Sequence, residues 1–354
     1  MPNRARMSWD QIISGRPGPW WGPLARAVLR ASEVPYRWAV AWRNRRYEQG
    51  WAVVQRVPVP VVSVGNITAG GTGKTPLVAW LGQWFAQRGL RVAFVSRGYK
   101  SRHGRLNDEA RVLRQIHPEI PHVQNPDRVA AARQAIRQFN AQVIILDDAF
   151  QHRRIHRDLD IVLIDALRPF GYRHVLPRGL LREPLAGLRR ADVVGLSRAD
   201  AVETHHRQVI HDEIAALAPH CRWIELAHRP SRLINADGAE STLGRLTGCH
   251  VVAFCGIGNP TGFQATLGQL ACQIHGFHVF PDHHDYGHAD IERLGSIVAT
   301  TRPAPEVILC THKDLVKLDA AAIAGVPVWA VDIEVDIGVG SRLLEETLER
   351  LLPE

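Results

Sequence analysis

The stretch SVGNITAGGTGKTPLVAW, residues 63–80, is the segment that decides the fold. A short apolar run is followed by a glycine-rich turn and then by residues that favour a helix, which is the context of a phosphate-binding loop. Gly70, Gly71 and Gly73 allow backbone N–H groups to approach anionic oxygens closely. The beginning of the helix adds its positive end to the same place. The stretch therefore predicts a nucleotide site.

The signature G-x-x-x-x-G-K-[ST] is incomplete, because its first glycine is replaced by Thr68. The first glycine opens the loop, and a threonine in an extended or turn conformation can do the same. Lys74 would reach the terminal phosphates, and Thr75 would offer its hydroxyl to Mg²⁺. A glycine turn without function would not require this Lys-Thr pair. The predicted nucleotide-binding segment is Thr68, Ala69, Gly70, Gly71, Thr72, Gly73, Lys74 and Thr75.

A phosphate-binding loop needs an acid at the end of a neighbouring strand to hold Mg²⁺. The segment QVIILDDAFQH supplies Asp147 and Asp148 directly after an apolar run. The structural alternative is that these acids cap the following turn. Asp165 ends the next strand and is a weaker candidate. We predict that at least one of Asp147 and Asp148 binds the metal.

Apolar strands and helices alternate along the chain, which predicts an α/β fold with a parallel sheet covered on both faces. Residues 226–248 are polar and have little periodicity, so we expect a connection there, followed by a second and smaller α/β unit. The 354 residues are enough for two cores. The predicted division is an N-terminal amphipathic helical segment (1–50), a P-loop NTPase-like parallel-sheet domain (51–235) and a second α/β domain (236–354).

The N-terminal segment differs in composition from the rest of the chain. The formal net charge is +8, and residues 1–50 carry nine arginines against three acids, so little excess charge remains elsewhere and nucleic acid is not an expected partner. Six of the ten tryptophans lie in the first 51 residues. Arginine with tryptophan is typical of a segment that lies on a membrane surface. The alternative is a helical hairpin, 22–34 and 36–48 with a break at Pro35, packed on the core.

The sequence predicts neither a membrane-spanning helix nor a signal peptide, because it has no sufficiently long apolar run. Five scattered cysteines, none in a CxxC pair, indicate a reducing compartment and argue against structural zinc.

Two acidic segments are candidates for the chemical step. Asp108 begins a predicted helix, where an aspartate is often only a cap. The segment FPDHHDYGH, residues 280–288, could form a metal cluster, an Asp-His pair for proton transfer, or a solvated loop. These interpretations stay open from the residues alone.

The ordered motifs resemble those of one family, the tetraacyldisaccharide 4′-kinases of lipid A biosynthesis. The resemblance covers residues 58–314 and includes the threonine at the first loop position. It is carried by GNITAGGTGKTP, SRGYK, NDEA, PDRVAAAR, LDDAFQHRRIHRDLDIVLID, LPRGLLREPLAGLRRAD, GIGNP and FPDHH.

The resemblance implies transfer of the γ-phosphate of ATP to the 4′-hydroxyl of an acylated glucosamine disaccharide 1-phosphate, with Mg²⁺. It implies a peripheral or monotopic enzyme on the cytoplasmic face of the inner membrane, held there by its N-terminal segment. Asp108 matches the catalytic acid of the family, and His283 matches its partner. The remaining matches are Asp147, Asp148 and Glu183 for the metal, and Arg128, Gln151, His152 and Arg182 for the substrate.

Two residues depart from the pattern of the family. Ala149 stands where a glycine is usual, and His312 where a glutamate is usual. The alternative function is a P-loop switch NTPase of the metal-insertion or partitioning type. THKD, residues 311–314, approaches the guanine-reading motif that a GTPase of this kind would need.

Overall fold

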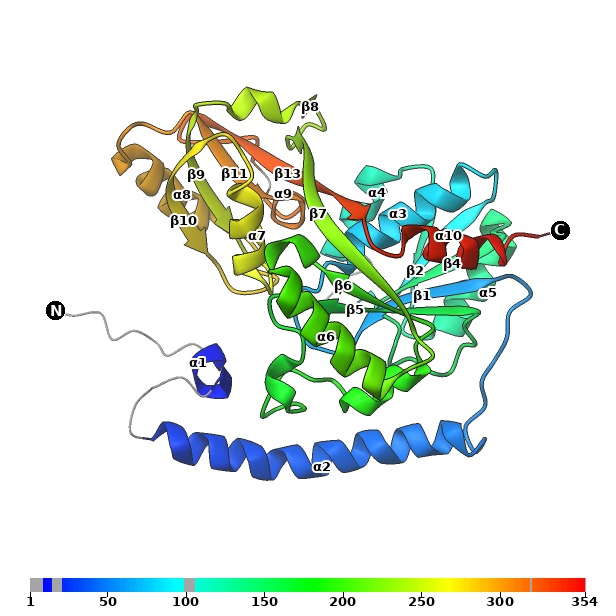
Figure 1. Ribbon diagram of the computed structural model, residues 1–354. Helices are drawn as coiled ribbons and strands as arrows, with labels where there is room; N and C mark the ends of the chain where they lie inside the picture. Colours follow the sequence, from blue (N-terminus) through cyan, green and yellow to red (C-terminus); the bar gives the residue numbers. More distant parts are fainter. Residues whose placement is uncertain (1–8, 15–20, 99–105, 319, 354) are drawn as a thin grey trace.

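The computed structural model describes residues 9–14, 21–98, 106–318 and 320–353, with the backbone alone for residues 9–11. Trp20 and Lys100 lie outside the described residues. The elements of the first half follow the predicted alternation (Figure 1). They are α1 (Trp9–Ser14), α2 (Gly22–Glu48), β1 (Val61–Asn66), α3 (Lys74–Ala86), β2 (Val92–Ser96), α4 (Asp108–Ile116), β3 (His122–Gln124), α5 (Arg128–Phe139), β4 (Val143–Asp147), β5 (Leu159–Asp165), β6 (Val193–Ser197) and α6 (Thr204–Leu217).

The second half repeats the alternation with fewer helices. Its elements are β7 (Arg222–Ile234), β8 (Glu240–Ser241), β9 (His250–Cys255), α7 (Pro260–Leu267), β10 (Gln273–Val279), α8 (His288–Thr300), β11 (Val307–Thr311), α9 (His312–Leu315), β12 (Ala322–Ile323), β13 (Val326–Ile337) and α10 (Ser341–Glu349).

One sheet runs through both halves, in the order β10-β9-β11-β13-β7-β6-β5-β1-β4-β2-β3. The pairs along this path inside each half are parallel, as the strand–helix alternation predicts. The two-residue strands β8 and β12 lie off the path and pair antiparallel with β7 and β13. The central strands β1, β4 and β5 are buried along their whole length. Helices cover both faces, α3 and α10 on one and α5 and α6 on the other. The α/β fold class is confirmed.

The interpretation of residues 226–248 as a connection was wrong for its first part. β7 reaches Ile234 and pairs with β6 in parallel and with β13 antiparallel, so the two long strands join the halves (Figure 1). The polar residues and weak periodicity of this segment concealed the strand, which also contains Pro230, a residue that cannot donate to a ladder. Pro230 lies where the register between β7 and β13 shifts, and such bulges accept proline. The division at residue 235 stays a prediction.

The predicted break at Pro35 is absent, because α2 is one helix from Gly22 to Glu48. Proline removes the hydrogen bond to the carbonyl of Ala31, and both residues are exposed, so water can satisfy that carbonyl. The predicted hairpin of two helices is therefore corrected to a single rod below the body (Figure 1). Among the described residues, no helix has the length and apolar character needed to cross a membrane.

Candidate active site

The site is a cleft of about 1000 Å³ between the two halves of the sheet. The first half lines it with the loop before α3, the start of α4 and the end of β4. The second half contributes the turns after β9, β10 and β11. The strands within each half are parallel and end at one edge of that half, and the antiparallel pairing of β7 with β13 turns these two carboxyl edges toward each other, so loops from both halves converge at the cleft. Of the predicted residues it is lined by Gly70, Gly71, Thr72, Gly73, Lys74, Thr75, Asp108, Arg128, Asp147, Asp148, Gln151, His152, Arg182 and His283.

The glycine-rich turn has the backbone geometry of a phosphate-binding loop. Gly70 has φ of 112° and Gly73 has φ of 75°, both in the region that disfavours other residues. A methyl group on Gly73 would collide with the ring of His228 on β7. Thr68 has no positive φ and forms a bridge with Leu181, so this position is extended and does not require glycine.

A second layer of contacts holds this loop in place. Arg198, which follows β6, donates to the carbonyl oxygen of Gly71 at 2.8 Å. Its guanidinium also pairs with Asp165 at 2.7 Å, and Asn259 donates to the same carboxylate at 2.7 Å. Asp165 is therefore occupied by structural partners, which removes it from the metal candidates. Asn259 belongs to the GIGNP turn, so the second half packs directly against the loop.

The two acids after β4 have different environments. Oδ1 of Asp148 lies 2.7 Å from Arg182 and 3.4 Å from the ammonium of Lys74. Burial alone would raise the pKa of Asp148, but these two cations lower it further than burial raises it. Asp147 is buried, and its Oδ1 has no hydrogen-bond partner. Burial, with the nearby charge of Glu109, raises the pKa of Asp147 to about 7.

A divalent cation fits this arrangement. The unpartnered oxygen of Asp147 and the hydroxyl of Thr75 both belong to residues that line the cleft, next to the phosphate loop. Among the described residues, no group of three or more His, Cys, Asp or Glu side chains could hold a metal. A P-loop site needs fewer protein ligands, because the phosphates of the nucleotide supply the rest.

Glu183 lies apart from the cleft lining. Its carboxylate is fully buried and accepts hydrogen bonds from Gln151 at 3.0 Å, Asn44 at 3.2 Å and Arg190 at 2.7 Å. Both carboxylate oxygens of Glu183 thus accept hydrogen bonds from other side chains of the protein. Gln151 also donates to the carbonyl of Asn66, which ties the segment after β4 to the phosphate loop. This environment favours a structural role for Glu183 over a metal role.

Arg128 and His152 line the cleft beside the acids. Arg128 begins α5, is 3% exposed, and its Nε has no partner. Burial, with the nearby charge of Arg128, lowers the pKa of His152 to about 4, so the imidazole is neutral at pH 7. Nη1 of Arg128 donates to the carbonyl of Pro126 at 3.3 Å, and a buried guanidinium with an unpaired Nε suits a phosphate or another anion. Contact of Arg128 and His152 with a substrate stays a prediction.

Asp108 and His283 come together across the cleft. Nδ1 of His283 lies 2.8 Å from Oδ2 of Asp108, although 175 positions separate the residues. Asn107, not Asp108, caps α4, because its side chain accepts from the N–H of Ala110. The alternative that Asp108 is only a cap is therefore wrong. The hydrogen bond raises the pKa of His283. Burial alone would raise the pKa of Asp108, but the hydrogen bond and charge of His283, together with the charge of Lys317, lower it further than burial raises it.

The other histidines of FPDHHDYGH have separate partners. His284 lies 3.0 Å from Asp290, and His288 lies 3.2 Å from Glu292 on α8. The hypothesis of a metal cluster in this segment therefore has no support in the described geometry.

Sequence reasoning missed several residues of the cleft. Lys313 pairs with Glu109 at 2.9 Å and brings a second ammonium near Asp147. Lys313 could have been found from the rarity of lysine, which accounts for four of the 43 lysine and arginine residues. His228 and Arg198 were missed because β7 was read as a connection and because the segment after β6 matched no phosphate motif.

The THKD segment cannot read a base in this conformation. Nδ1 of His312 lies 3.1 Å from Asp332, and its Nε2 lies 2.7 Å from Gln115. Asp314 is fully buried and accepts from Thr311, among other groups. A guanine-reading aspartate needs a free carboxylate. The switch-GTPase alternative therefore loses the feature that favoured it.

Ala149 is accommodated without strain. It is fully buried and does not have a positive φ, so the backbone there does not need the usual glycine.

Comparison with known proteins agrees with this geometry. The sequence profile described as "LpxK: Tetraacyldisaccharide-1-P 4′-kinase" matches residues 25–353. The chain belongs to the tetraacyldisaccharide 4′-kinase family. It is 37% identical over 368 residues to the tetraacyldisaccharide 4′-kinase of Syntrophus aciditrophicus, covering 94% of each chain. It is 36% identical over 365 residues to that of Anaeromyxobacter sp. (strain K), covering 95% of this chain and 93% of the relative.

A member of the family has been solved with nucleotide. The crystal structure of LpxK from Aquifex aeolicus in complex with ATP superposes with a TM-score of 0.72 at 30% identity. The match covers 93% of this chain and all of the other. The similarity extends over both halves and therefore includes the cleft between them.

Proposed function

We propose that this protein transfers the γ-phosphate of ATP to the 4′-hydroxyl of tetraacyldisaccharide 1-phosphate, giving the bisphosphorylated lipid A precursor. One observation carries the proposal: the Asp108–His283 pair, which joins the two halves, lines the same cleft as the phosphate loop. A loop that only hydrolysed or sensed nucleotide would not need a paired acid and base opposite it. A kinase needs such a pair to activate the hydroxyl that accepts the phosphate.

Each residue of the cleft has a role in this reaction. The amides of the loop and the ammonium of Lys74 bind the phosphates of ATP. Asp108 accepts the proton of the 4′-hydroxyl as that oxygen attacks phosphorus, and His283 orients and balances Asp108. The phosphate or sugar groups of the two substrates would be contacted by Arg128, Gln151, His152 and Arg182, which line the cleft. Positioning and charge neutralisation account for most of the rate in phosphoryl transfer.

Mg²⁺ would be held by Thr75 and Asp147, with Asp148 beside them. The unpartnered buried oxygen of Asp147 supports this assignment. When bound, the ion would neutralise charge on the β- and γ-phosphates. Asp148 has a different contribution, because it is already engaged by Lys74 and Arg182 and fixes their positions in the free protein.

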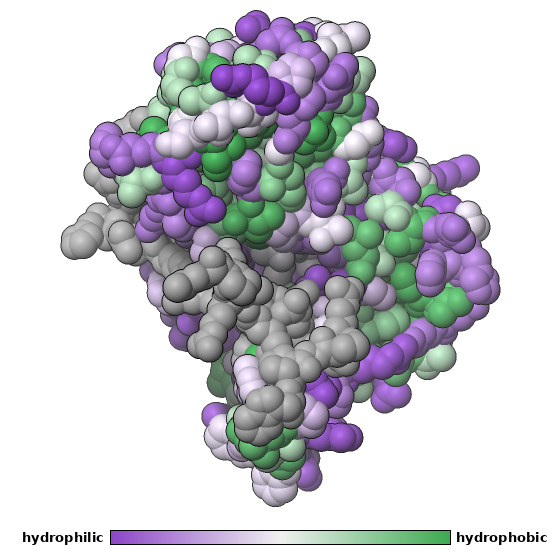
Figure 2. Space-filling model, turned by 90° about the vertical axis from the view of Figure 1, so that its left-hand side faces the viewer, coloured by the Kyte–Doolittle hydropathy of each residue, from purple (hydrophilic) through white to green (hydrophobic). Residues whose placement is uncertain are grey.

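The N-terminal helix is proposed to hold the enzyme on the cytoplasmic face of the inner membrane, where an acylated substrate would lie. One stripe of α2 faces the body: Glu33 bonds His174, Tyr36 bonds the carbonyl of Arg182, and Val40 is buried. The opposite stripe is exposed and apolar, with intervals of four and three residues, as an interfacial helix requires. It consists of Leu24, Val28, Ala31, Pro35, Trp38 and Trp42. Figure 2 shows apolar surface at the lower end of the molecule, over α2.

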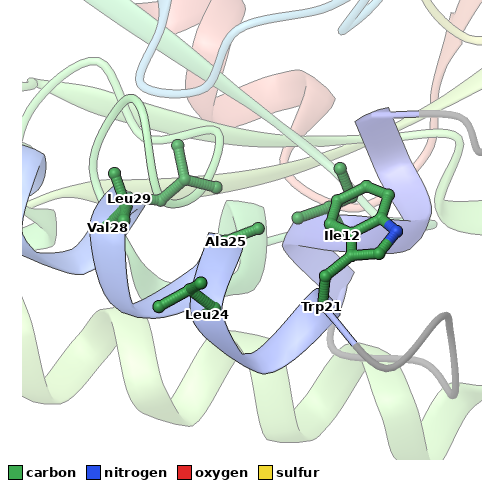
Figure 3. A pocket seen from close by; sticks show the side chains of 6 residues that line it. All are labelled: Ile12, Trp21, Leu24, Ala25, Val28 and Leu29. Carbon is green, nitrogen blue, oxygen red and sulfur yellow. The ribbon is translucent and has the colours of Figure 1, made fainter.

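The groove between α1 and α2 suits an acyl chain. Its volume is about 360 Å³, and Figure 3 shows only apolar side chains around it. The aromatic ring of Trp21 closes one end, and Ile12 of α1 faces the start of α2 (Figure 3). We propose that lipid tails enter here while the sugar reaches the cleft. The lining residues are Ile12, Trp21, Leu24, Ala25, Val28 and Leu29.

The direct test is phosphorylation of the lipid. Purified protein would be incubated with γ-labelled ATP, Mg²⁺ and tetraacyldisaccharide 1-phosphate in detergent micelles, and the lipid products separated. We expect labelled bisphosphorylated lipid with wild type and none with Lys74→Met. Labelled inorganic phosphate without labelled lipid, or nucleotide hydrolysis that requires a protein partner, would refute the kinase assignment and favour the switch NTPase.

A further inference from the structure

The lysines of this chain are confined to very few places. Of 43 basic residues, only four are lysines, at positions 74, 100, 313 and 317. Lys74 and Lys313 line the cleft, and Lys317 lies directly behind it against Asp108. Lysine presents a compact point charge where arginine presents a planar fork. The reaction described above gives neither Lys313 nor Lys317 a role, and of these two Lys317 forms the ion pair with Asp108.

Lys317 is a buried ammonium beneath the Asp108–His283 pair. Its side chain is 7% exposed, and its Nζ has no hydrogen-bond partner. Nζ lies 3.7 Å from Oδ2 of Asp108 and 3.3 Å from Oδ1 of Asp314. A buried charge without hydrogen bonds is costly, so its retention points to a use beyond packing.

Asp314 anchors this ammonium to the second half of the sheet. Its Oδ1 accepts from the N–H of Gly256 at 3.0 Å and from the hydroxyl of Tyr286 at 2.9 Å. Its Oδ2 accepts from Thr311 at 2.6 Å. With this many donors Asp314 is a fixed acceptor, and the position of Lys317 is fixed with it.

Two side chains of the second half therefore contact the same carboxylate oxygen of Asp108, which belongs to the first half. His283 and Lys317 both contact Oδ2 of Asp108. Within the described residues, the side-chain partners of Asp108 fall on that oxygen alone, which leaves Oδ1 for an incoming hydroxyl. Such a division keeps one oxygen as an anchor and the other as the proton acceptor.

We propose that Lys317 is a positioning residue for the phosphoryl-transfer reaction, which holds Asp108 ionised and turned so that Oδ1 faces the acceptor. The inference rests on the proposed function, in which Asp108 takes the proton of the hydroxyl. It adds a third member to the pair and places it on the half of the protein that also carries His283. Asp108 would thus reach its working state only when the second half is in place.

The test compares Lys317→Met with wild type over a range of pH. The charged groups facing Asp108 are Glu109 on α4, Asp282 and His283 after β10, and Lys313, Asp314 and Lys317 in and after α9. Removing one positive charge from this set makes every remaining group easier to protonate. We expect kcat to fall at least tenfold, the KM for ATP to change less than about threefold, and the acid limb of the kcat profile to move up by about one pH unit.

A double-mutant cycle separates positioning from mere structure. If Lys317 acts through Asp108, Lys317→Met should change kcat little in an Asp108→Asn background. If Lys317→Met does not fold, the same measurements are made on Lys317→Gln, which keeps a polar group at the end of a shorter side chain. Lys317→Arg should restore the acid limb towards that of wild type.

The outcomes are distinct. An acid limb unchanged in Lys317→Met, or a loss of kcat that adds fully to that of Asp108→Asn, overturns the role of Lys317 and leaves the kinase assignment intact. A wild-type enzyme that does not phosphorylate the lipid overturns both. A shifted limb together with a non-additive loss supports the proposal.

Discussion

The exposed stripe of α2 gives the sharpest quantitative prediction. In the double variant Trp38→Gln/Trp42→Gln, two indoles that contact water are removed from the stripe without touching the body. Their exposed fractions are 77% and 61%. Taking about 250 Å² for each tryptophan, these fractions correspond to roughly 340 Å² of accessible side chain. Their loss should weaken attachment to a lipid surface and leave folding unchanged.

The magnitude follows from the area that enters lipid. If about half of that surface is removed from water at about 25 cal/mol per Å², the two residues contribute roughly 4 kcal/mol to membrane binding. A change of this size corresponds to about a thousandfold in the partition coefficient. Flanking arginines add an electrostatic part that the substitution does not alter. The expected loss is therefore the same on neutral and on anionic vesicles.

The assay is co-sedimentation with vesicles of phosphatidylcholine, with and without phosphatidylglycerol, over a range of lipid concentration. Phe139→Gln is the matched control, because this residue is an aromatic side chain 44% exposed at the end of α5. It should partition as wild type does. The melting temperatures of all three proteins should agree. If the double variant binds vesicles as tightly as wild type, the stripe does not face the membrane.

Three further predictions concern the cleft. Gly73→Ala places a methyl group against the ring of His228, at a backbone φ of 75° that costs about 1–2 kcal/mol in strain alone. Titration calorimetry should show that the variant has lost its affinity for ATP, and an affinity equal to that of wild type would contradict the loop geometry. Asp108→Asn should lower kcat by about 10² to 10⁴ while ATP affinity stays; loss of ATP binding instead would move Asp108 to the nucleotide site. Because the pKa of Asp147 is raised to about 7, protons compete with Mg²⁺ below that pH. The Mg²⁺ concentration for half-maximal rate should rise about tenfold per pH unit below 7, and Asp147→Asn should abolish that dependence on pH. A Mg²⁺ requirement equal at pH 6 and pH 8 would contradict the assignment of Asp147 to the metal.

Local patterns were enough for the part of the site that one stretch of chain builds. The phosphate loop and the acids at 147–148 are each formed within a strand and the turn that follows it. Their chemistry is therefore readable from neighbouring residues, and the resemblance to one kinase family supplied the acceptor. Thr68 was interpreted correctly as compatible with the loop, and the structure adds the reason, which is its extended pairing with Leu181.

Local patterns failed where a long-range contact overrides a local signal. Polar residues with little periodicity argued against a strand at 226–234, yet β7 forms through its ladder with β13, which accommodates Pro230 at a bulge. Pro35 argued for a break, yet α2 continues because the freed carbonyl faces water and the body supports the opposite stripe. In both places the packing of distant elements outweighs the secondary-structure preference of the local sequence.

By itself, the sequence determined that this protein has an α/β fold with a P-loop, a pair of acids suited to a metal, and an arginine- and tryptophan-rich start. Only the tertiary structure decided that β7 and β13 join the halves into one sheet and that His283 and Lys317 meet on one oxygen of Asp108. The physical reason is distance along the chain. Periodicity and turn chemistry act over a few residues, whereas the contacts of Asp108 with His283 and Lys317 join positions 175 or more apart and exist only after the sheet has formed.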